Sequence, residues 1–319
     1  MIDRRFEPAT VLLYDPQATM RHNTRVALLG VGFGSVEATA TPEEFLKKAS
    51  DKKYDLIMAD TKGPEGLIAE VVQRIRHHEI GSNPFTNIMI TTWDTSPEIV
   101  RAGVRSGVDD LIGRPMSTQQ IADRVSGLVS SRKPFVVAEN YIGPDRRNML
   151  RLGQTANTLI VPNSLKAKVE DRPELDATPG NVKLALAAVN ERKITIYTER
   201  FLLLSKKVMS LTGGLEDLER RRELVLQMLE INADLIKRID GSDLKHLLPL
   251  ADALEKLLER VAGSAKELSE QDRELMYQIP FALHKASEQA RLSADMAFDI
   301  AKLSKEIRKR PKGVVGFPE

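Results

Sequence analysis

Short apolar runs alternate with helix-forming segments along the first part of the chain. Five runs predict buried strands, and each ends on or just before a polar residue or a glycine; they lie at residues 10–14, 36–40, 55–59, 87–92 and 110–113. The segments between them place apolar residues three or four apart, which is the period of an amphipathic helix. Strands that are apolar on both faces need helices on both sides of a parallel sheet. Residues 1–131 are therefore predicted to form an α/β doubly wound, parallel five-stranded sheet.

Capping signals support three of these helices. Thr41 and Ser96 each stand directly before a proline, which fits the first turn of a helix. Ser117 is followed three residues later by Gln120, which predicts a capping box. We expect helices to begin at these three positions.

Residues 132–180 follow neither the strand period nor the helix period. Prolines recur and no apolar repeat persists, which predicts an extended linker. Phe135, Tyr141 and Ile142 are expected to pin this linker to a neighbouring surface. The run Gly-Pro-Asp-Arg-Arg at 143–147 offers two guanidinium groups that could bind a phosphate or a carboxylate. A structural strap with two solvated arginines is the simpler interpretation.

The chain reads as helix from residue 181 to residue 312, with a tail at 313–319. The first long helix, about 181–212, carries an apolar seam in strict three–four spacing, formed by Ile194, Tyr197, Phe201, Leu204, Val208 and Leu211. A narrow seam is typical of a coiled coil or of a long bundle helix. It suggests either a homodimer through this helix or packing within its own bundle. Four long helices with short connections predict an all-α antiparallel bundle for 181–312.

Composition excludes several classes of protein. The 47 Lys and Arg nearly balance the 45 Asp and Glu, so a formal net charge of +2 gives no support for nucleic acid binding. Cysteine is absent, which rules out disulfides and thiolate metal sites. No apolar run approaches the ~18 residues needed to cross a bilayer, and the charged N-terminus does not read as a signal peptide. We therefore expect a cytoplasmic protein without a membrane span.

Polar residues gather where the predicted strands end. Asp15, Asp60 and Thr92 fall at the carboxyl ends of three strands, and Arg114-Pro115 follows the fifth. In a doubly wound sheet the ligand site lies at this edge, so these side chains are expected to meet there.

This order of residues resembles the receiver domain of bacterial response regulators, of the chemotaxis type, over about residues 9–131. The resemblance implies a flavodoxin-like fold in which Asp60 accepts a phosphoryl group from a histidine kinase or phosphotransfer protein. It also implies that Thr92 is the switch residue and that Arg114 contacts the phosphate. Mg²⁺ would be held by Asp15, Asp60 and the backbone carbonyl of Lys62.

Three departures from the family pattern affect that site. The second acid that usually follows the first strand is Pro16 here, which predicts a weakened Mg²⁺ site. The family's lysine is Arg114, a planar fork instead of a compact point charge. Trp93, the only tryptophan of the chain, directly follows Thr92 and is expected to overhang Asp60.

The histidines give no sign of a further activity. Neither His246 nor His284 has the pattern of phosphotransfer bundles, in which a lysine and a glycine follow the phosphate-accepting histidine at fixed spacing. The His77-His78 pair is most simply a solvated helix end. No Glu-x-x-His pairs project from opposing helices, so a di-iron bundle is not supported. We expect the chain not to be an enzyme, beyond the autophosphorylation that a receiver itself carries out.

Two functions remain open. The first is a two-component response regulator whose output is a protein–protein interaction through the helical module, switched by phosphorylation of Asp60. The alternative is a constitutive scaffold or adaptor, with a degenerate, non-phosphorylated receiver and a dimerising helical bundle. Magnesium-dependent phosphorylation of Asp60 separates them. Nucleic acid binding is a weaker third possibility, which a steep salt dependence of association would reveal.

Overall fold

The chain forms two compact units, Met1–Val189 and Asn190–Glu319. The computed structural model describes residues 3–62, 66–146, 158–211, 215–264 and 267–309, with backbone alone for Leu215 and for 290–309. The expected domain boundaries at 131, 180 and 312 remain a prediction, and the tail at 313–319 lies outside the described residues.

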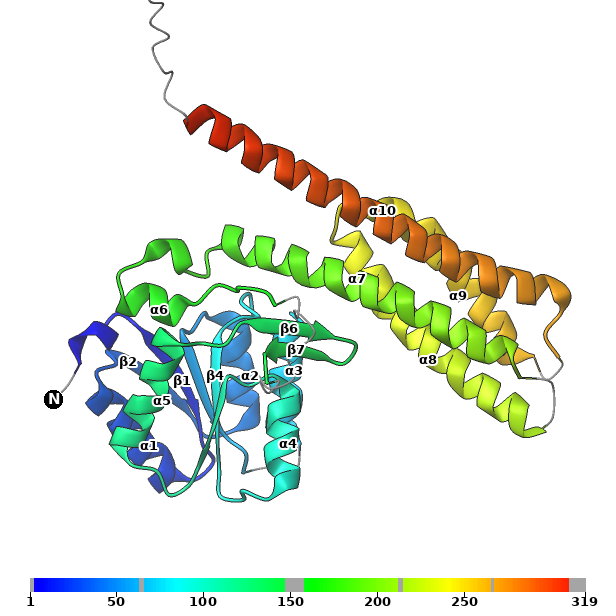
Figure 1. Ribbon diagram of the computed structural model, residues 1–319. Helices are drawn as coiled ribbons and strands as arrows, with labels where there is room; N and C mark the ends of the chain where they lie inside the picture. Colours follow the sequence, from blue (N-terminus) through cyan, green and yellow to red (C-terminus); the bar gives the residue numbers. More distant parts are fainter. Residues whose placement is uncertain (1–2, 63–65, 147–157, 212–214, 265–266, 310–319) are drawn as a thin grey trace, which may run out of the picture. The chain divides into compact units, whose positions relative to one another are not determined.

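A five-stranded parallel sheet is the centre of the first unit (Figure 1). The strand order is β2-β1-β3-β4-β5. The strands begin and end within one residue of the predicted positions; they are β1 (Thr10–Tyr14), β2 (Ser35–Thr39), β3 (Leu56–Asp60), β4 (Asn87–Thr92) and β5 (Asp110–Gly113). Every residue of β3 and β4 is buried, as expected for strands with helices on both sides. The predicted doubly wound α/β fold is confirmed.

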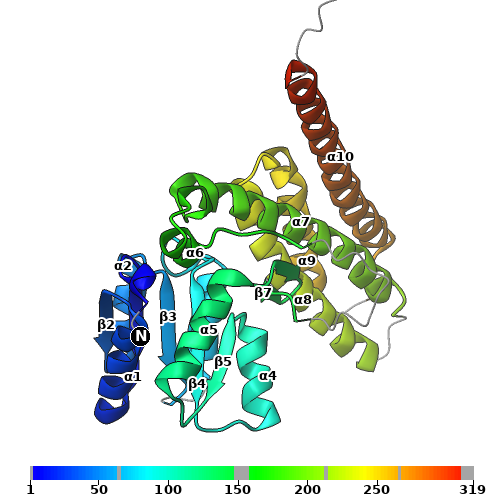
Figure 2. The same ribbon diagram turned by 60° about the vertical axis from the view of Figure 1, so that its left-hand side comes forward.

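Five helices cover the two faces of this sheet (Figure 2). On one face lie α1 (Ala18–Val31) and α5 (Thr118–Ser130), which share a core with β1 and β3. On the other face lie α2 (Pro42–Asp51), α3 (Leu67–Arg76) and α4 (Pro97–Ser106). A short 3-10 turn at Arg4–Phe6 adds Phe6 to the first core.

The predicted helix starts are found at all three positions. The Thr41 hydroxyl accepts a hydrogen bond from the Glu44 amide at 3.3 Å, and Ser117 with Gln120 forms the capping box. Helix α4 begins at the proline after Ser96, although the Ser96 side chain makes no capping hydrogen bond.

The segment that read as an extended linker contains regular structure. Its described part forms an antiparallel hairpin, a short helix, a 3-10 turn and the start of a long helix; these are β6 (Phe135–Ala138), β7 (Tyr141–Pro144), α6 (Ser164–Val169), η2 (Pro173–Leu175) and α7 (Pro179–Met209). Phe135 and Ile142 are buried together with Phe85, which lies just before β4. Two of the three expected anchors therefore pack in this core, whereas Tyr141 is half-buried and its hydroxyl donates to the Pro144 carbonyl.

Arg146 acts as a strap within this segment. Its Nη2 atom donates to the backbone carbonyls of Val108 at 2.8 Å and Asp109 at 2.6 Å. The simpler interpretation of the Gly-Pro-Asp-Arg-Arg run is a structural strap with two solvated arginines. Arg146 does hold the segment to the sheet, but its guanidinium donates to backbone carbonyls instead of being fully solvated. Arg147 lies outside the described residues.

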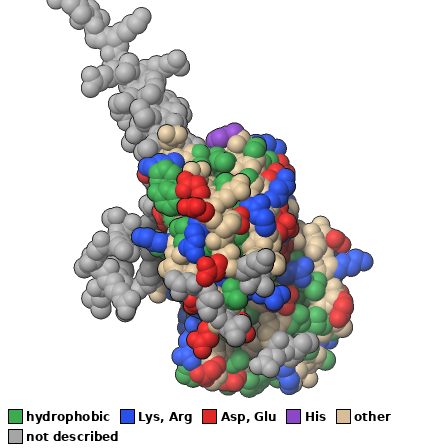
Figure 3. Space-filling view, turned by 90° about the vertical axis from the view of Figure 1, so that its right-hand side faces the viewer, with side chains coloured by type: hydrophobic (Ala, Val, Ile, Leu, Met, Phe, Trp, Pro, Cys, Tyr) green, Lys and Arg blue, Asp and Glu red, His purple; other side chains and the backbone are tan. Residues whose placement is uncertain are grey.

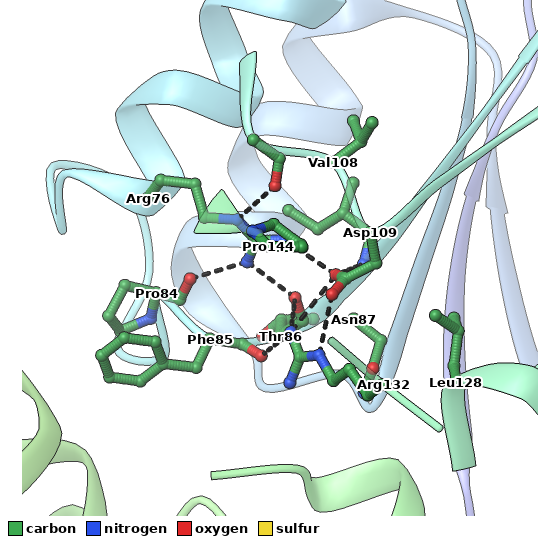
Figure 4. Close-up of polar contacts among 12 residues, drawn as sticks. Arg76, Pro84, Phe85, Thr86, Asn87, Val108, Asp109, Leu128, Arg132 and Pro144 are labelled. Atoms are coloured by element: carbon green, nitrogen blue, oxygen red, sulfur yellow. Dashed lines mark hydrogen bonds and ion pairs between the residues drawn. The ribbon is translucent and has the colours of Figure 1, made fainter. Parts of the chain in front are cut away.

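A buried ionic cluster ties the segment to the sheet. Arg76 and Arg132 both point to Asp109 (Figure 4), with N–O distances of 2.8 and 2.7 Å. The two guanidinium groups also lie 5.1 and 5.0 Å from the ring centre of Phe135. Burial alone would raise the pKa of Asp109, but the positive charges of Arg132 and Arg76 hold that pKa below its ordinary value. Arg132 thus joins the hairpin to the start of β5.

The second unit is helical, as predicted. It comprises the second half of α7 with α8 (Leu215–Asp240), η3 (Lys245–Leu247), α9 (Leu248–Gly263) and α10 (Glu270–Lys309), and α10 continues through Pro280. Five seam residues, from Ile194 to Val208, are at most 4% exposed and line the core of this unit. These five residues therefore pack within their own unit, which was one of the two expected arrangements, and the homodimer remains a prediction. Among the described residues, no helix is long and apolar enough to cross a membrane.

A polar network crosses between α7 and α8. The Tyr197 hydroxyl donates to Asp234 Oδ2 at 2.5 Å, and Arg238 Nε lies 2.8 Å from the same oxygen. Arg238 Nη1 donates to Asn190 at 3.0 Å, and the Lys193 ammonium donates to the Tyr197 hydroxyl at 3.2 Å. These hydrogen bonds fix how the two helices lie against each other.

Candidate functional site

Four polar side chains meet at the carboxyl edge of the sheet. Asp15 follows β1, Asp60 ends β3, Thr91 lies near the end of β4 and Arg114 follows β5. Asp15, Asp60 and Thr91 are 1 to 2% exposed, and the Arg114 side chain is 3% exposed. The sheet topology brings them together because the carboxyl ends of parallel strands lie along one edge.

Arg114 bridges the two carboxylates. Its Nη2 atom lies 2.6 Å from Asp15 Oδ2, and its Nε atom lies 2.8 Å from Asp60 Oδ2. The same two nitrogens donate to the Thr91 hydroxyl at 3.0 and 3.2 Å. Thr91 in turn donates to Asp60 Oδ2 at 2.9 Å. One guanidinium thus contacts every other side chain of the site.

The remaining carboxylate oxygens are held by the backbone. Asp15 Oδ1 accepts a hydrogen bond from the Gln17 amide at 2.9 Å, and Asp60 Oδ1 accepts one from the Lys62 amide at 2.8 Å. Each of the four oxygens therefore accepts at least one hydrogen bond. Burial raises the pKa of Asp15 and the charge of Asp60 adds to this, while the Gln17 amide and Arg114 oppose it.

The contact to Asp60 that we expected of Thr92 is made by Thr91. Asp60 and Thr91 are register partners in the sheet, and neighbouring residues of a strand point to opposite faces. The Thr92 hydroxyl instead donates to the Asp94 carbonyl at 2.9 Å, within its own loop. Two adjacent threonines ended the predicted strand, and only the register distinguishes them. Thr91 is the residue that the sequence alone missed.

The other expected residues lie close to the site in sequence. Lys62 contacts Asp60 through its backbone N–H, a donor that cannot bind a cation, and the metal-binding role of its carbonyl remains a prediction. Trp93 is 50% exposed and comes two residues after Thr91. Pro115 forms a cis peptide bond with Arg114.

A β2-β1-β3-β4-β5 parallel sheet with buried carboxylates at the carboxyl ends of its first and third strands is the arrangement expected of a receiver-type domain. Residues 11–126 match the family model of the response regulator receiver domain. The resemblance inferred from the sequence is thus confirmed for the N-terminal part, and the match does not include the helical unit.

Two curated relatives match less than half of the chain. The probable transcriptional regulatory protein TcrX of Mycobacterium tuberculosis is 22% identical over 156 residues, which are 46% of this chain and 64% of TcrX. The alkaline phosphatase synthesis transcriptional regulatory protein PhoP of Bacillus subtilis is 26% identical over 144 residues, 45% of this chain and 57% of PhoP. The chain therefore spans less than two thirds of the length of these relatives.

Solved structures match a little over a third of the chain. Chemotaxis protein CheY4 of Vibrio cholerae is 27% identical, with 37% of this chain and 96% of CheY4 covered and a TM-score of 0.34. A response regulator from Thermotoga maritima is 24% identical, with 39% and 98% covered and a TM-score of 0.34.

Receiver domains typically bind Mg²⁺ at their acidic site, so the residues present here must be compared with that ion's needs. Mg²⁺ requires oxygen ligands in near-octahedral geometry at about 2.0–2.1 Å. Asp15 Oδ2 and Asp60 Oδ2 both hold Arg114, and the two Oδ1 atoms hold backbone amides. Over the part of the chain that the structure describes, no three His, Cys, Asp or Glu residues are grouped to hold a metal. In this arrangement the site does not fit Mg²⁺.

Proposed function

We propose that this chain is a signalling adaptor of the two-component type. Its receiver domain docks a histidine kinase or phosphotransfer protein, and its helical unit binds a protein target. Phosphorylation of Asp60 controls neither contact. The observation that carries the proposal is that Asp60 is inaccessible: its side chain is 2% exposed, and both of its carboxylate oxygens accept hydrogen bonds.

The chemistry of phosphoryl transfer explains why this observation matters. A carboxylate attacks phosphorus only if an oxygen can reach it and if fixed positive charge neutralises the phosphoryl oxygens. Here the positive charge of Arg114 is already paired with Asp15 and Asp60. Moving the guanidinium away would leave two buried carboxylates without a counter-charge, which is strongly unfavourable.

The helical unit supplies a surface for a protein target. Tyr277 and Phe281 on α10 are 56% and 43% exposed, and their rings stack with centres 6.1 Å apart. Exposed aromatic pairs are common at protein–protein interfaces. On the face drawn in Figure 3, basic and acidic side chains are interspersed without a continuous basic stripe, which is not the pattern of a nucleic acid interface.

The proposal includes that the full chain forms a homodimer through its helical unit. Sedimentation velocity of the full chain tests it, and a Tyr277→Ala/Phe281→Ala variant tests whether the aromatic pair contributes. A monomer at all concentrations would remove the homodimer and leave a different protein as the target of the helical unit.

A phospho-switch is the second candidate, and one observation favours it. Asp60 has a hydroxyl, Thr91, and a cation, Arg114, within hydrogen-bonding distance. Those two groups are the kind that would hold a phosphoryl group on Asp60.

Phosphoryl transfer distinguishes the two candidates. The full chain is incubated with acetyl phosphate and Mg²⁺, and separately with purified phosphorylated histidine kinases and phosphotransfer proteins, with Asp60→Asn as the control. We expect binding to a kinase or phosphotransfer protein with equal affinity for both chains, and no added phosphoryl group in the intact mass. Stoichiometric phosphorylation that is lost in Asp60→Asn would overturn the adaptor and establish the switch.

A further inference from the structure

We infer that Arg114 is the built-in cation of this site and takes the place that Mg²⁺ has in a receiver domain. The inference rests on the receiver fold and does not depend on the adaptor function. Arg114 makes the acidic site stable without a metal, and replacing this one residue would create a metal site.

The two buried carboxylates need a counter-charge, because an unpaired charge away from water is very costly. Within the described residues, Arg114 alone forms ion pairs with Asp15 and Asp60. Arg21 Nη1 donates to the backbone carbonyl of Asp15 at 2.8 Å and is not paired with either carboxylate there. One guanidinium, that of Arg114, thus supplies the counter-charge that both carboxylates contact.

The shape of the guanidinium makes this possible. Its donors are fixed in a planar fork, so Nε reaches Asp60 while Nη2 reaches Asp15. A lysine in the same place has one compact ammonium group, which would leave room for another cation between the acids. Pro16 fits the same interpretation, because the missing acid reduces the negative charge that one arginine must neutralise.

The inference predicts a latent Mg²⁺ site. In the wild-type chain Mg²⁺ must displace Arg114 from both carboxylates, so it should bind poorly. Replacing Arg114 with lysine frees oxygens of Asp15 and Asp60 for the metal. Binding to the folded state alone then raises stability with ion concentration.

Thermal unfolding of the full chain tests this, followed by the fluorescence of Trp93, the lone tryptophan, which lies in the receiver unit. MgCl₂ is raised to tens of millimolar at constant ionic strength. We expect no change of midpoint in wild type and a saturable rise of a few degrees in Arg114→Lys and Arg114→Ala. Arg124→Lys, which changes a surface arginine, is the matched control and should behave as wild type.

Two results would overturn the inference. One is a saturable Mg²⁺ effect of equal size in the wild-type chain. The other is no Mg²⁺ effect in Arg114→Lys while circular dichroism shows that this variant is folded. Adding Asp60→Asn to Arg114→Lys should abolish the effect, and an effect that persists would place the metal elsewhere.

The outcome is separable from the proposed function. Phosphorylation of the wild-type chain by acetyl phosphate would remove the adaptor, whatever the Mg²⁺ titration of the variants shows. Conversely, failure of the titration would leave kinase binding by the Asp60→Asn chain untouched.

Discussion

The Nε atom of Arg114 lies 2.8 Å from the Oδ2 atom of Asp60, and both side chains are at most 3% exposed. The family that the sequence resembles has a lysine at this position, so the replacement of lysine by Arg114 lies at the centre of the site. The separate nitrogens of Arg114 bridge two carboxylates, whereas a lysine would bring one compact ammonium group.

Removing that bridge should destabilise the receiver unit. We expect Arg114→Ala, without Mg²⁺, to lower the free energy of unfolding by about 3–5 kcal/mol, because two buried carboxylates lose their partner. Urea unfolding followed by Trp93 fluorescence measures it, with Arg124→Ala as a surface control. Adding Asp15→Asn should recover part of the loss, and the two substitutions should therefore not be additive.

The two adjacent threonines should differ in their effects. Thr91→Val removes a hydroxyl bonded to both Asp60 and Arg114, so we expect a loss of about 1–3 kcal/mol. Thr92→Val removes only hydrogen bonds within its own loop and should cost less. Urea unfolding of the two variants tests this. Equal losses, or a larger loss for Thr92→Val, would contradict the placement of Thr91 in the site.

The ionic cluster around Asp109 should also contribute to stability. Arg132→Ala deletes a 2.7 Å ion pair with Asp109 and a hydrogen bond to the Phe85 carbonyl, all in a buried environment. We expect a loss of about 1.5–3 kcal/mol, because Arg76 still pairs with Asp109. Denaturant unfolding measures the loss. An unchanged midpoint would contradict a stabilising role for the contacts of Arg132.

The helical unit should respond to acid through Asp234. Burial alone would raise the pKa of this carboxyl, but the hydrogen bonds from Arg238 and Tyr197 lower it below the ordinary value of 3.8. A lowered pKa in the folded state gives stability that is fully present above the ordinary value and is lost as pH falls through the lowered pKa. Wild type should therefore lose stability in this acidic range relative to Asp234→Asn. Parallel pH–stability curves of the two chains, from circular dichroism at 222 nm, would contradict the expectation.

Much of the fold follows from the sequence. Apolar runs that are buried on both faces predict a parallel sheet, and the capping hydroxyls of Thr41 and Ser117 locate two helix starts. The hairpin of β6 and β7 was not predicted, because its strands have only four residues each and its turn lacks glycine. Phe135 and Ile142 gave the one signal that this segment packs against a neighbouring surface.

The site is harder to predict than the fold. Asp15, Asp60 and Arg114 follow from their positions after strands. The choice between Thr91 and Thr92 depends on strand register, which is set by the whole sheet and not by local sequence. The bridge made by Arg114 depends on the distance between the carboxylates of Asp15 and Asp60, and this distance cannot be derived from their positions in the sequence.

Phe135 packs against the guanidinium groups of Arg76 and Arg132, although it lies outside the receiver domain as the family defines it. A receiver is commonly regarded as a module that evolution can attach to different outputs. Here the family match ends at residue 126, whereas Asp109 depends on Arg132, and Phe85 packs on Phe135. A recombination event at the family boundary would leave the buried Asp109 with one of its two arginines, Arg76, and would leave Phe85 without its aromatic partner. A transfer that extends through the hairpin would keep both contacts.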